Sequence, residues 1–199
     1  MFKSLHCIAL RTVRYSDRHN IVTVYSHEQG RVSLHDTAKE CWIAAKRGKT
    51  PPEDTLWYID AVEEALCFGW IDSTLKNVDG VVLQRFGPRS KSSNWTELNK
   101  ERCRRLEKLG MMTDAGRAAC PDLDKEFVIL PEIIAIFETD PEAWANFTSS
   151  PPLYQRVRID NIQRTKSRRE LFDSRLKKLI EASRQGYLIG DWHADSLNR

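Results

Sequence analysis

The feature that most constrains the fold is a periodic apolar stripe near the C-terminal end of the chain. Between residues 168 and 184, six positions recur at intervals that fit one helix face, namely the apolar Leu171, Phe172, Leu176, Leu179 and Ile180 together with Arg175. Gly186 follows, and glycine at such a place is typical of a helix end. A helix with one apolar face has to be covered by other elements, so the pattern predicts a packed helical module.

Three segments before this stripe carry proline at or next to a predicted helix start. Pro131 opens an apolar run to residue 137, and Asp140 with Pro141 opens a run to residue 147. Ser150, Pro151 and Pro152 precede a segment that extends to about residue 163. Proline is favoured in the first turn because its missing N–H would have no partner there. We therefore expect three helices ahead of the helix at 168–184.

Further helix signals lie in the first two thirds of the chain. Asp60 is expected to cap a helix to about residue 69, Asn94 and Glu97 to start a helix to about residue 109, and Thr113 to start a short helix. The segment Thr37–Glu40 has the form of a capping box, so a helix is expected over residues 41–45. In all, we expect six to eight helices.

Strand signals are confined to two places. Residues 5–34 contain alternating and β-branched side chains, as in residues 21–25, which predicts two or three strands of a meander. Residues 81–86 form a short predicted strand after the turn at 77–80. The fold class expected is α+β, mostly α: a short N-terminal β-meander (residues 1–35) followed by a helical bundle with a small β element (residues 36–199).

Composition excludes several classes of function. No run of 18 apolar residues and no signal peptide is visible, so we expect a cytoplasmic protein without membrane insertion. The five cysteines are far apart with no C-x-x-C pair, which argues against disulfides and zinc. The motifs of common hydrolases, nucleotide-binding loops and metalloproteases are absent, and residues 36–192 contain no histidine. We expect no catalysis, no metal and no cofactor.

The main candidate site combines a basic loop with a predicted helix N-terminus. Residues 82–105 contain seven Lys or Arg and two acidic residues. Arginine forks and free helix amides both hold anions, and flanking aromatic side chains can stack on a ring. The expected ligand-binding residues are Glu64, Trp70, Asp72, Arg85, Phe86, Arg89, Lys91 and Trp95. The alternative is that the aromatic rings belong to the core and that the arginines pair with Asp72 or Glu64.

A second basic region favours another class of partner. Residues 156–178 contain nine basic and three acidic residues, and the loop at 164–169 is basic. Together with cations in the N-terminal strands, this loop suggests contacts to a nucleic-acid backbone. The residues of this alternative are Arg11, Arg14, Arg18, Arg31, Lys166, Arg168 and Arg169.

Two resemblances accompany these patterns. The stretches 60–72, 83–89 and 94–102, with the helices over 143–154 and 168–184, resemble the YdeI/OmpD-associated, bacteriocin-protection family over about residues 37–190. Residues 8–15, 21–25 and 28–31 resemble the start of the oligonucleotide-binding domain of the RecO recombination mediator.

The first resemblance implies a non-enzymatic bacteriocin-protection or stress-related protein, which we expect to bind an anionic small molecule or a protein partner. The second implies a DNA-binding accessory in repair and recombination, with nucleic acid as its partner.

Overall fold

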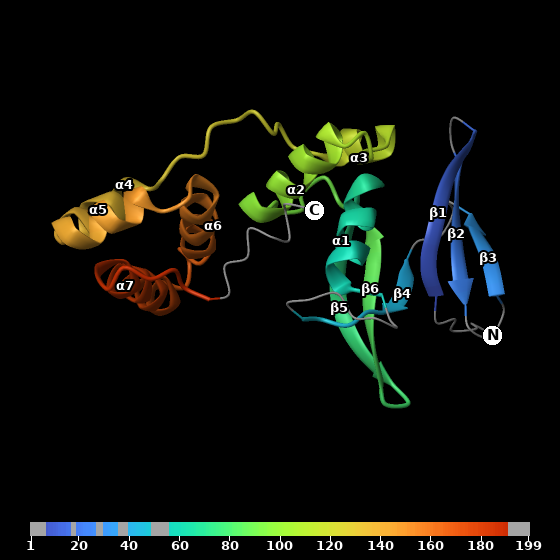
Figure 1. The fold of residues 1–199 in the computed structure, drawn as a ribbon, viewed down its shortest axis with the longest axis horizontal. Helices are drawn as coiled ribbons and strands as arrows, with labels where there is room; N and C mark the ends of the chain where they lie inside the picture. Colours follow the sequence, from blue (N-terminus) through green and yellow to red (C-terminus); the bar gives the residue numbers. More distant parts are fainter. Residues whose placement is uncertain (1–6, 17–18, 27–29, 36–39, 49–55, 191–199) are drawn as a thin grey trace. The chain divides into compact units, whose positions relative to one another are not determined.

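The computed structural model describes residues 7–16, 19–26, 30–35, 40–48 and 56–190, and between residues 7 and 35 it describes the backbone only. This part of the chain contains six strands and seven helices (Figure 1). The mostly helical α+β class is confirmed. The chain divides into two units, which comprise residues 1–93 with 106–120 and residues 94–105 with 121–199. The expected domain boundary at residue 35 stays a prediction.

The N-terminal meander is confirmed. Strands β1 (Cys7–Ser16), β2 (His19–Ser26) and β3 (Gly30–His35) form an antiparallel sheet in chain order. The register pairs Ile8 with Tyr25 and Val24 with Val32. Local alternation and short connections are enough to specify such a meander.

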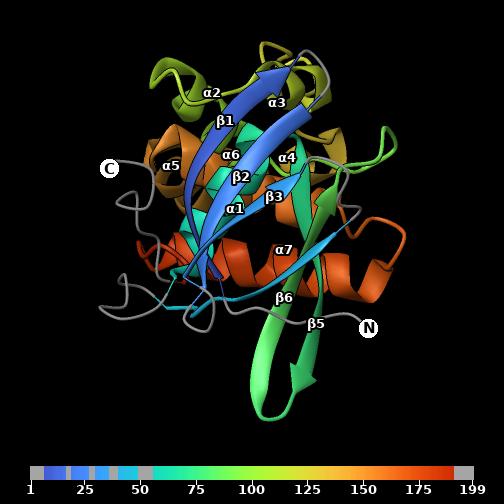
Figure 2. The same cartoon turned by 90° about the vertical axis from the view of Figure 1, so that its right-hand side faces the viewer.

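A second antiparallel sheet has the order β4-β6-β5 and contains two strands that were not predicted. β4 (Cys41–Ala44) replaces the helix expected at 41–45, because its backbone pairs with β6 (Val81–Pro88) about 40 residues away. Trp42 and Ile43 are aromatic and β-branched, which suits a strand. β5 (Trp70–Val78) pairs along β6 as a hairpin, visible in Figure 2.

The turn of this hairpin confirms the expected turn at residues 77–80. Asp79 and Gly80 both have positive φ, 50° and 85°, as the tightest hairpin connections require. The side chain of Asn77 accepts a hydrogen bond from the Gly80 amide at 3.0 Å.

Helix α1 (Tyr58–Cys67) begins two residues before the expected cap, with Trp57 as its N-cap residue and Asp60 in its first turn. α3 (Asp114–Ala119) is capped by the predicted Thr113, whose hydroxyl accepts from the Gly116 amide and donates to the Cys67 carbonyl oxygen at 2.6 Å. One hydroxyl therefore caps α3 and fixes it to the end of α1.

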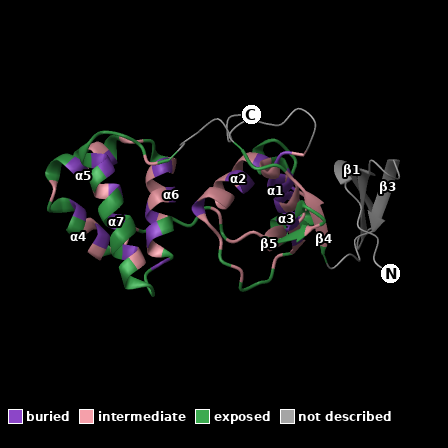
Figure 3. Ribbon diagram, turned by 90° about the horizontal axis from the view of Figure 1, so that it is seen from below, coloured by how far each residue is buried: buried purple, intermediate pink, exposed green. Residues whose placement is uncertain are grey.

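The second unit contains the helices whose starts carried proline signals. These are α4 (Pro131–Glu138), α5 (Pro141–Ser149), α6 (Pro152–Gln163) and α7 (Arg169–Arg184), which confirms the four predicted helices. Figure 3 colours buried residues purple on all four helices. Their buried side chains form one core, made of Ile133, Phe137, Ala143, Phe147, Tyr154, Ile159, Ile162, Phe172, Leu176 and Leu179. The rings of Phe137 and Phe147 are stacked at 4.8 Å. The apolar face of α7 is therefore covered by α4, α5 and α6, as its periodicity predicted.

Helix α3 provides the first testable prediction. A Cβ added at Gly116 would lie 2.2 Å from the Cys67 carbonyl oxygen, which is backbone and cannot rotate away. Glycine to alanine within a helix normally stabilises by about 0.5–1 kcal/mol. Here we expect Gly116→Ala to lower the free energy of unfolding by about 1–3 kcal/mol, as overpacking of a core does.

Urea unfolding followed by circular dichroism measures this change. Ala118→Ser, on the exposed side of the same helix, is the control and is expected to change the free energy of unfolding by less than about 0.5 kcal/mol. A Gly116→Ala protein as stable as the parent would contradict the close packing of α3 on α1.

Candidate functional site

The residues of the first candidate site do not all fall in the same unit. Glu64 on α1, Trp70 and Asp72 on β5, and Arg85 and Phe86 on β6 belong to the first unit, as do Arg89 and Lys91 after β6. Trp95 belongs to the second unit. The β5–β6 register places Asp72 opposite Phe86 and Trp70 opposite Pro88, and the Arg89 amide donates to the Gly69 carbonyl oxygen at 2.9 Å.

Arg85 pairs with Glu40, an acid that no sequence pattern linked to it. Its Nε lies 2.5 Å from Glu40 Oε2, and the Trp42 indole donates to the other oxygen of Glu40 at 3.1 Å. The hydrogen bond from Trp42 and then that from Arg85 lower the pKa of the Glu40 carboxyl. The alternative had expected Arg85 to pair with Asp72 or Glu64. For Arg85 that expectation was wrong.

Asp72 is bound by a tyrosine instead. The Tyr58 hydroxyl donates to Asp72 Oδ2 at 2.6 Å, and the Arg47 guanidinium lies 3.6 Å from the centre of the Tyr58 ring. Burial, and then the hydrogen bond to Asp72, raise the pKa of Tyr58 to about 12, so its proton stays in place. Arg47 also donates to Gln84 at 2.9 Å. Sequence reasoning missed Tyr58 and Arg47 because no local pattern marks them.

Phe86 is a core residue. Its side chain is 1% exposed, whereas a ring that stacks on a ligand needs an open face. Trp70 and Trp95 are half-buried, and Lys91 is exposed. For Phe86, the alternative is therefore correct: this aromatic ring belongs to the core.

The helix start in the anion hypothesis also differs. Helix α2 (Glu97–Lys108) begins three residues after Asn94, and its cap is Thr96, whose hydroxyl accepts from the Asn99 amide at 3.1 Å. The Glu97 amide donates to the Asp160 carboxylate on α6 at 3.2 Å. A helix N-terminus attracts negative charge, and here a carboxylate of the chain itself supplies it.

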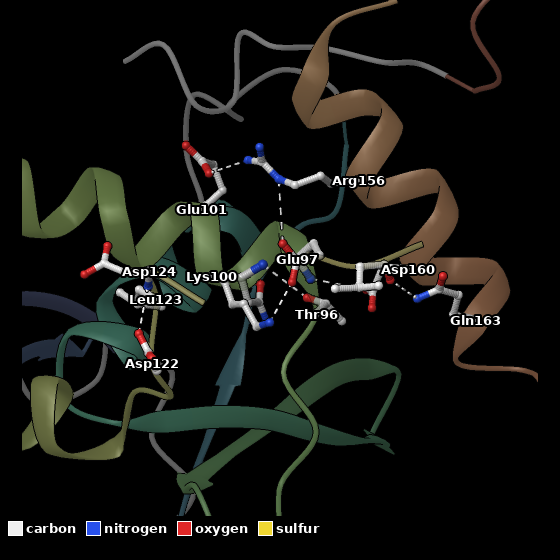
Figure 4. Close-up of polar contacts among 12 residues, drawn as sticks. Thr96, Glu97, Lys100, Glu101, Asp122, Leu123, Asp124, Arg156, Asp160 and Gln163 are labelled. Carbon is white, nitrogen blue, oxygen red and sulfur yellow. Dashed lines mark hydrogen bonds and ion pairs between the residues drawn. The ribbon is translucent and has the colours of Figure 1, made fainter. Parts of the chain in front are cut away.

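A network of ion pairs surrounds this helix start (Figure 4). Glu97 is 3% exposed and lies 2.6 Å from Lys100 Nζ, while Arg156 Nη2 lies 2.9 Å from Glu101. Arg156 Nε lies 3.7 Å from Glu97. Burial raises the pKa of the Asp160 carboxyl above its ordinary value, although the Glu97 amide and nearby Arg164 act in the opposite direction. The charges of this cluster are matched within the chain, as buried charges must be.

The second basic region is partly neutralised as well. Glu132 on α4 lies 3.5 Å from Lys166 and 3.0 Å from Arg169, and the Arg169 contact is the main cause of the lowered pKa of Glu132. Arg168 is exposed at the N-cap of α7. Arg11, Arg14 and Arg31 lie on β1 and β3 with side chains outside the described atoms, and Arg18 lies outside the described residues.

A groove on the second unit gathers cations that the structure does not pair with acids among the described residues. Its volume is about 310 Å³, and its lining consists of Arg158, Asn161, Ile162, Arg175, Lys178, Leu179 and Ile189. Arg158 donates to the Ile189 carbonyl oxygen, and Arg175 donates to the Asn161 carbonyl oxygen at 2.6 Å. We name this feature the α6–α7 groove. The excess of bases in residues 156–178 was its only signal in the sequence.

The described residues define a mostly helical α+β protein whose C-terminal unit carries a cationic groove. Residues 126–186 match the family described as "Bacteriocin-protection, YdeI or OmpD-Associated", and this C-terminal module belongs to that family. Residues 32–119 match a family described as "Domain of unknown function (DUF8412)". The first match confirms the expected family over a shorter stretch than residues 37–190.

No curated protein and no solved structure matches the chain. The resemblance of residues 1–34 to RecO finds no support in these comparisons.

Two features are absent from the described residues. No helix there is both long and apolar enough to cross a membrane. No group of three or more His, Cys, Asp or Glu side chains in that part of the chain is arranged to hold a metal ion.

Asp160 provides a prediction about pH. A carboxyl whose pKa is raised by folding contributes stability below its unfolded value of 3.8, and that contribution is lost as the pH rises through the folded value. Asparagine keeps an oxygen that accepts from the Glu97 amide and never ionises. We therefore expect Asp160→Asn to gain stability relative to the parent as the pH rises from about 3.5 to about 7.

The control is a carboxyl with the opposite shift. The Ala143 amide and then Arg184 lower the pKa of Asp140, so its contribution is present above 3.8 and is lost as the pH falls. Asp140→Asn should lose stability relative to the parent over the same rise in pH. Urea denaturation of both variants across this range measures the two slopes, and equal signs would contradict the assigned shifts.

Proposed function

We propose that the chain is a non-enzymatic bacteriocin-protection protein that acts by binding an anionic ligand or partner, and that the α6–α7 groove is the binding site. The observation that carries this proposal is the convergence of Arg158, Arg175 and Lys178 on one groove. The groove lies almost wholly within the stretch that matches the bacteriocin-protection family. It replaces the Trp70–Trp95 region as the site.

The state of the three cations supports anion binding. Arg158 and Arg175 each donate to a backbone carbonyl, which orients the guanidinium without cancelling its charge. A guanidinium has five N–H donors, so each arginine retains several for a ligand. Lys178 is exposed and has no ion pair within the described part of the chain. An anion therefore gains charge-assisted hydrogen bonds without displacing a carboxylate of the protein.

The cations of the Trp70–Trp95 region, the site first expected, are less available to an anion. At Arg85 an anion has to compete with Glu40, and at the start of α2 it has to compete with Asp160. In both places the competitor is tethered by the fold and therefore present at high effective concentration. The α6–α7 groove has no such competitor among the described residues.

The non-enzymatic part of the proposal rests on the chemistry of the described side chains. Cys67 is 2% exposed in the interior, where a thiol is inert. Asp72, Glu97 and Asp160 are engaged with Tyr58, Lys100 and the Glu97 amide. Residues 36–192 contain no histidine that would serve as a general base near pH 7.

The proposal is tested by reversing the charge of the groove. Full-length protein is expected to be stabilised by inorganic phosphate, by about 2.7 kcal/mol when phosphate is a hundredfold above its dissociation constant. Arg175→Glu/Lys178→Glu should abolish this stabilisation. Lys178→Glu alone, which breaks no described hydrogen bond, should weaken it at least tenfold.

The control makes the same change of charge elsewhere. Lys108→Glu/Lys125→Glu alters two exposed lysines outside the groove and should leave the effect of phosphate unchanged. In cells that express the chain, survival under bacteriocin challenge should follow the same order. Equal responses of the two double variants would place anion binding outside the groove. A steep salt-dependent shift with short single-stranded DNA would instead favour the nucleic-acid alternative.

A further inference from the structure

The α6–α7 groove has two chemically different surfaces. Arg158, Arg175 and Lys178 supply positive charge, whereas Ile189 and the aliphatic stems of those three cations supply apolar surface, with the core residues Ile162 and Leu179 at the base of the lining. An inorganic anion would use only the first surface. The second surface implies that the natural occupant also has an apolar part.

We propose that the groove binds a small amphipathic anion, with one carboxylate or phosphate head group and a short aliphatic chain. This inference rests on the proposed function, which assigns anion binding to the groove, and adds the class of ligand. The head group lies against the three cations, and the alkyl chain of the ligand lies along Ile189 and the aliphatic stems of the cationic side chains.

The aliphatic side of the groove is part of a fixed wall. Ile162 and Leu179 belong to the core of the four-helix module and are 3% and 1% exposed, so they support the wall from within while the half-buried Ile189 presents its aliphatic surface. Ile189 is held through both of its main-chain groups, because its amide donates to the Tyr154 hydroxyl at 2.9 Å and its carbonyl oxygen accepts from Arg158. A wall that is already ordered costs a ligand little conformational entropy.

Arg158 is the residue that joins the two surfaces. Its guanidinium lies 5.1 Å from the centre of the Tyr154 ring and donates to Ile189. Its guanidinium has further N–H donors besides the one bonded to Ile189, and these can donate to the oxygens of a head group.

The size and the charge pattern favour a small molecule with a single head group over a polymer. A volume of about 310 Å³ lies at the lower end of the range for small-molecule sites. A nucleic acid needs cations spaced along a track, and Lys166 and Arg169 beyond the groove are already paired with Glu132.

A series of carboxylates tests the inference on full-length protein. Calorimetric titration with acetate, butyrate, hexanoate and octanoate should show affinity rising by about threefold to fourfold per buried methylene. The affinity should therefore increase on the order of a hundredfold from butyrate to octanoate. Octyl phosphate, measured alongside octanoate, assigns the head group, and binding of either supports the proposal.

Two variants separate the two surfaces. Ile189→Ser should flatten the dependence on chain length while acetate and phosphate still bind. Arg175→Gln/Lys178→Gln should weaken every member of the series at least tenfold. Val128→Ser, at an apolar residue that is 70% exposed and outside the groove, is the control and should change neither.

The outcomes distinguish this inference from the proposed function. Phosphate binding without any dependence on chain length would overturn the amphipathic ligand and leave the anion site intact. Failure of phosphate and of every carboxylate to bind would overturn both. If octanoate binds to the Arg175→Gln/Lys178→Gln protein with unchanged affinity, its alkyl chain binds outside the groove. That result would also overturn the inference.

Discussion

The pairing of cationic with acidic side chains limits the places at which this protein could bind an anion. A charged group that loses water on folding has to be compensated, and within a helical protein the nearest compensation is an opposite charge on another element. Arg85 is compensated by Glu40, and Arg156 by Glu101 with Glu97. These pairs hold elements in place. They also mean that an anion at Arg85 or Arg156 has to compete with a carboxylate of the protein.

The cations of the α6–α7 groove are compensated in another way. Arg158 and Arg175 are anchored by backbone carbonyls, which are dipoles and leave the net charge of the guanidinium intact. The sequence does not show whether an arginine pairs with a carboxylate or bonds to a backbone carbonyl. Only the three-dimensional structure distinguishes them, and the distinction moves the candidate site from the β5–β6 region to the C-terminal module.

The helices of the C-terminal module could be predicted because their signals are local. Pro131, Asp140 with Pro141, and Gly186 mark starts and an end within one turn of the element concerned. β4 and the extent of β5 could not be predicted in this way. Their backbones depend on β6, and the pairing of Cys41 with Phe86 spans 45 residues with no local trace. The capping-box pattern at Thr37–Glu40 was overridden by that pairing.

The same limit applied to the site. The excess of positive charge in residues 156–178 was visible in the sequence, but the assignment of each cation depended on partners far along the chain. The Glu97 amide meets Asp160 across 63 residues, and Arg169 meets Glu132 across 37. Net charge counts every cation alike. The proposed binding depends on the few cations whose charge the fold orients and does not cancel.

The hydrogen bonds from Arg158 and Arg175 to backbone carbonyls also affect the free energy of the proposed binding. An anion at Arg85 would have to break a contact to Glu40 that the fold maintains, so the free energy of that ion pair would be subtracted from its binding. At Arg158 and Arg175 the anchoring hydrogen bond uses one N–H group of the planar fork, and the proposed ligand would use others. The anchor would therefore persist in the bound state and keep the guanidinium in the same orientation. Because binding and fold do not compete for the same donors, a groove of this kind can bind an anion without unfolding any contact that holds α6 and α7 together.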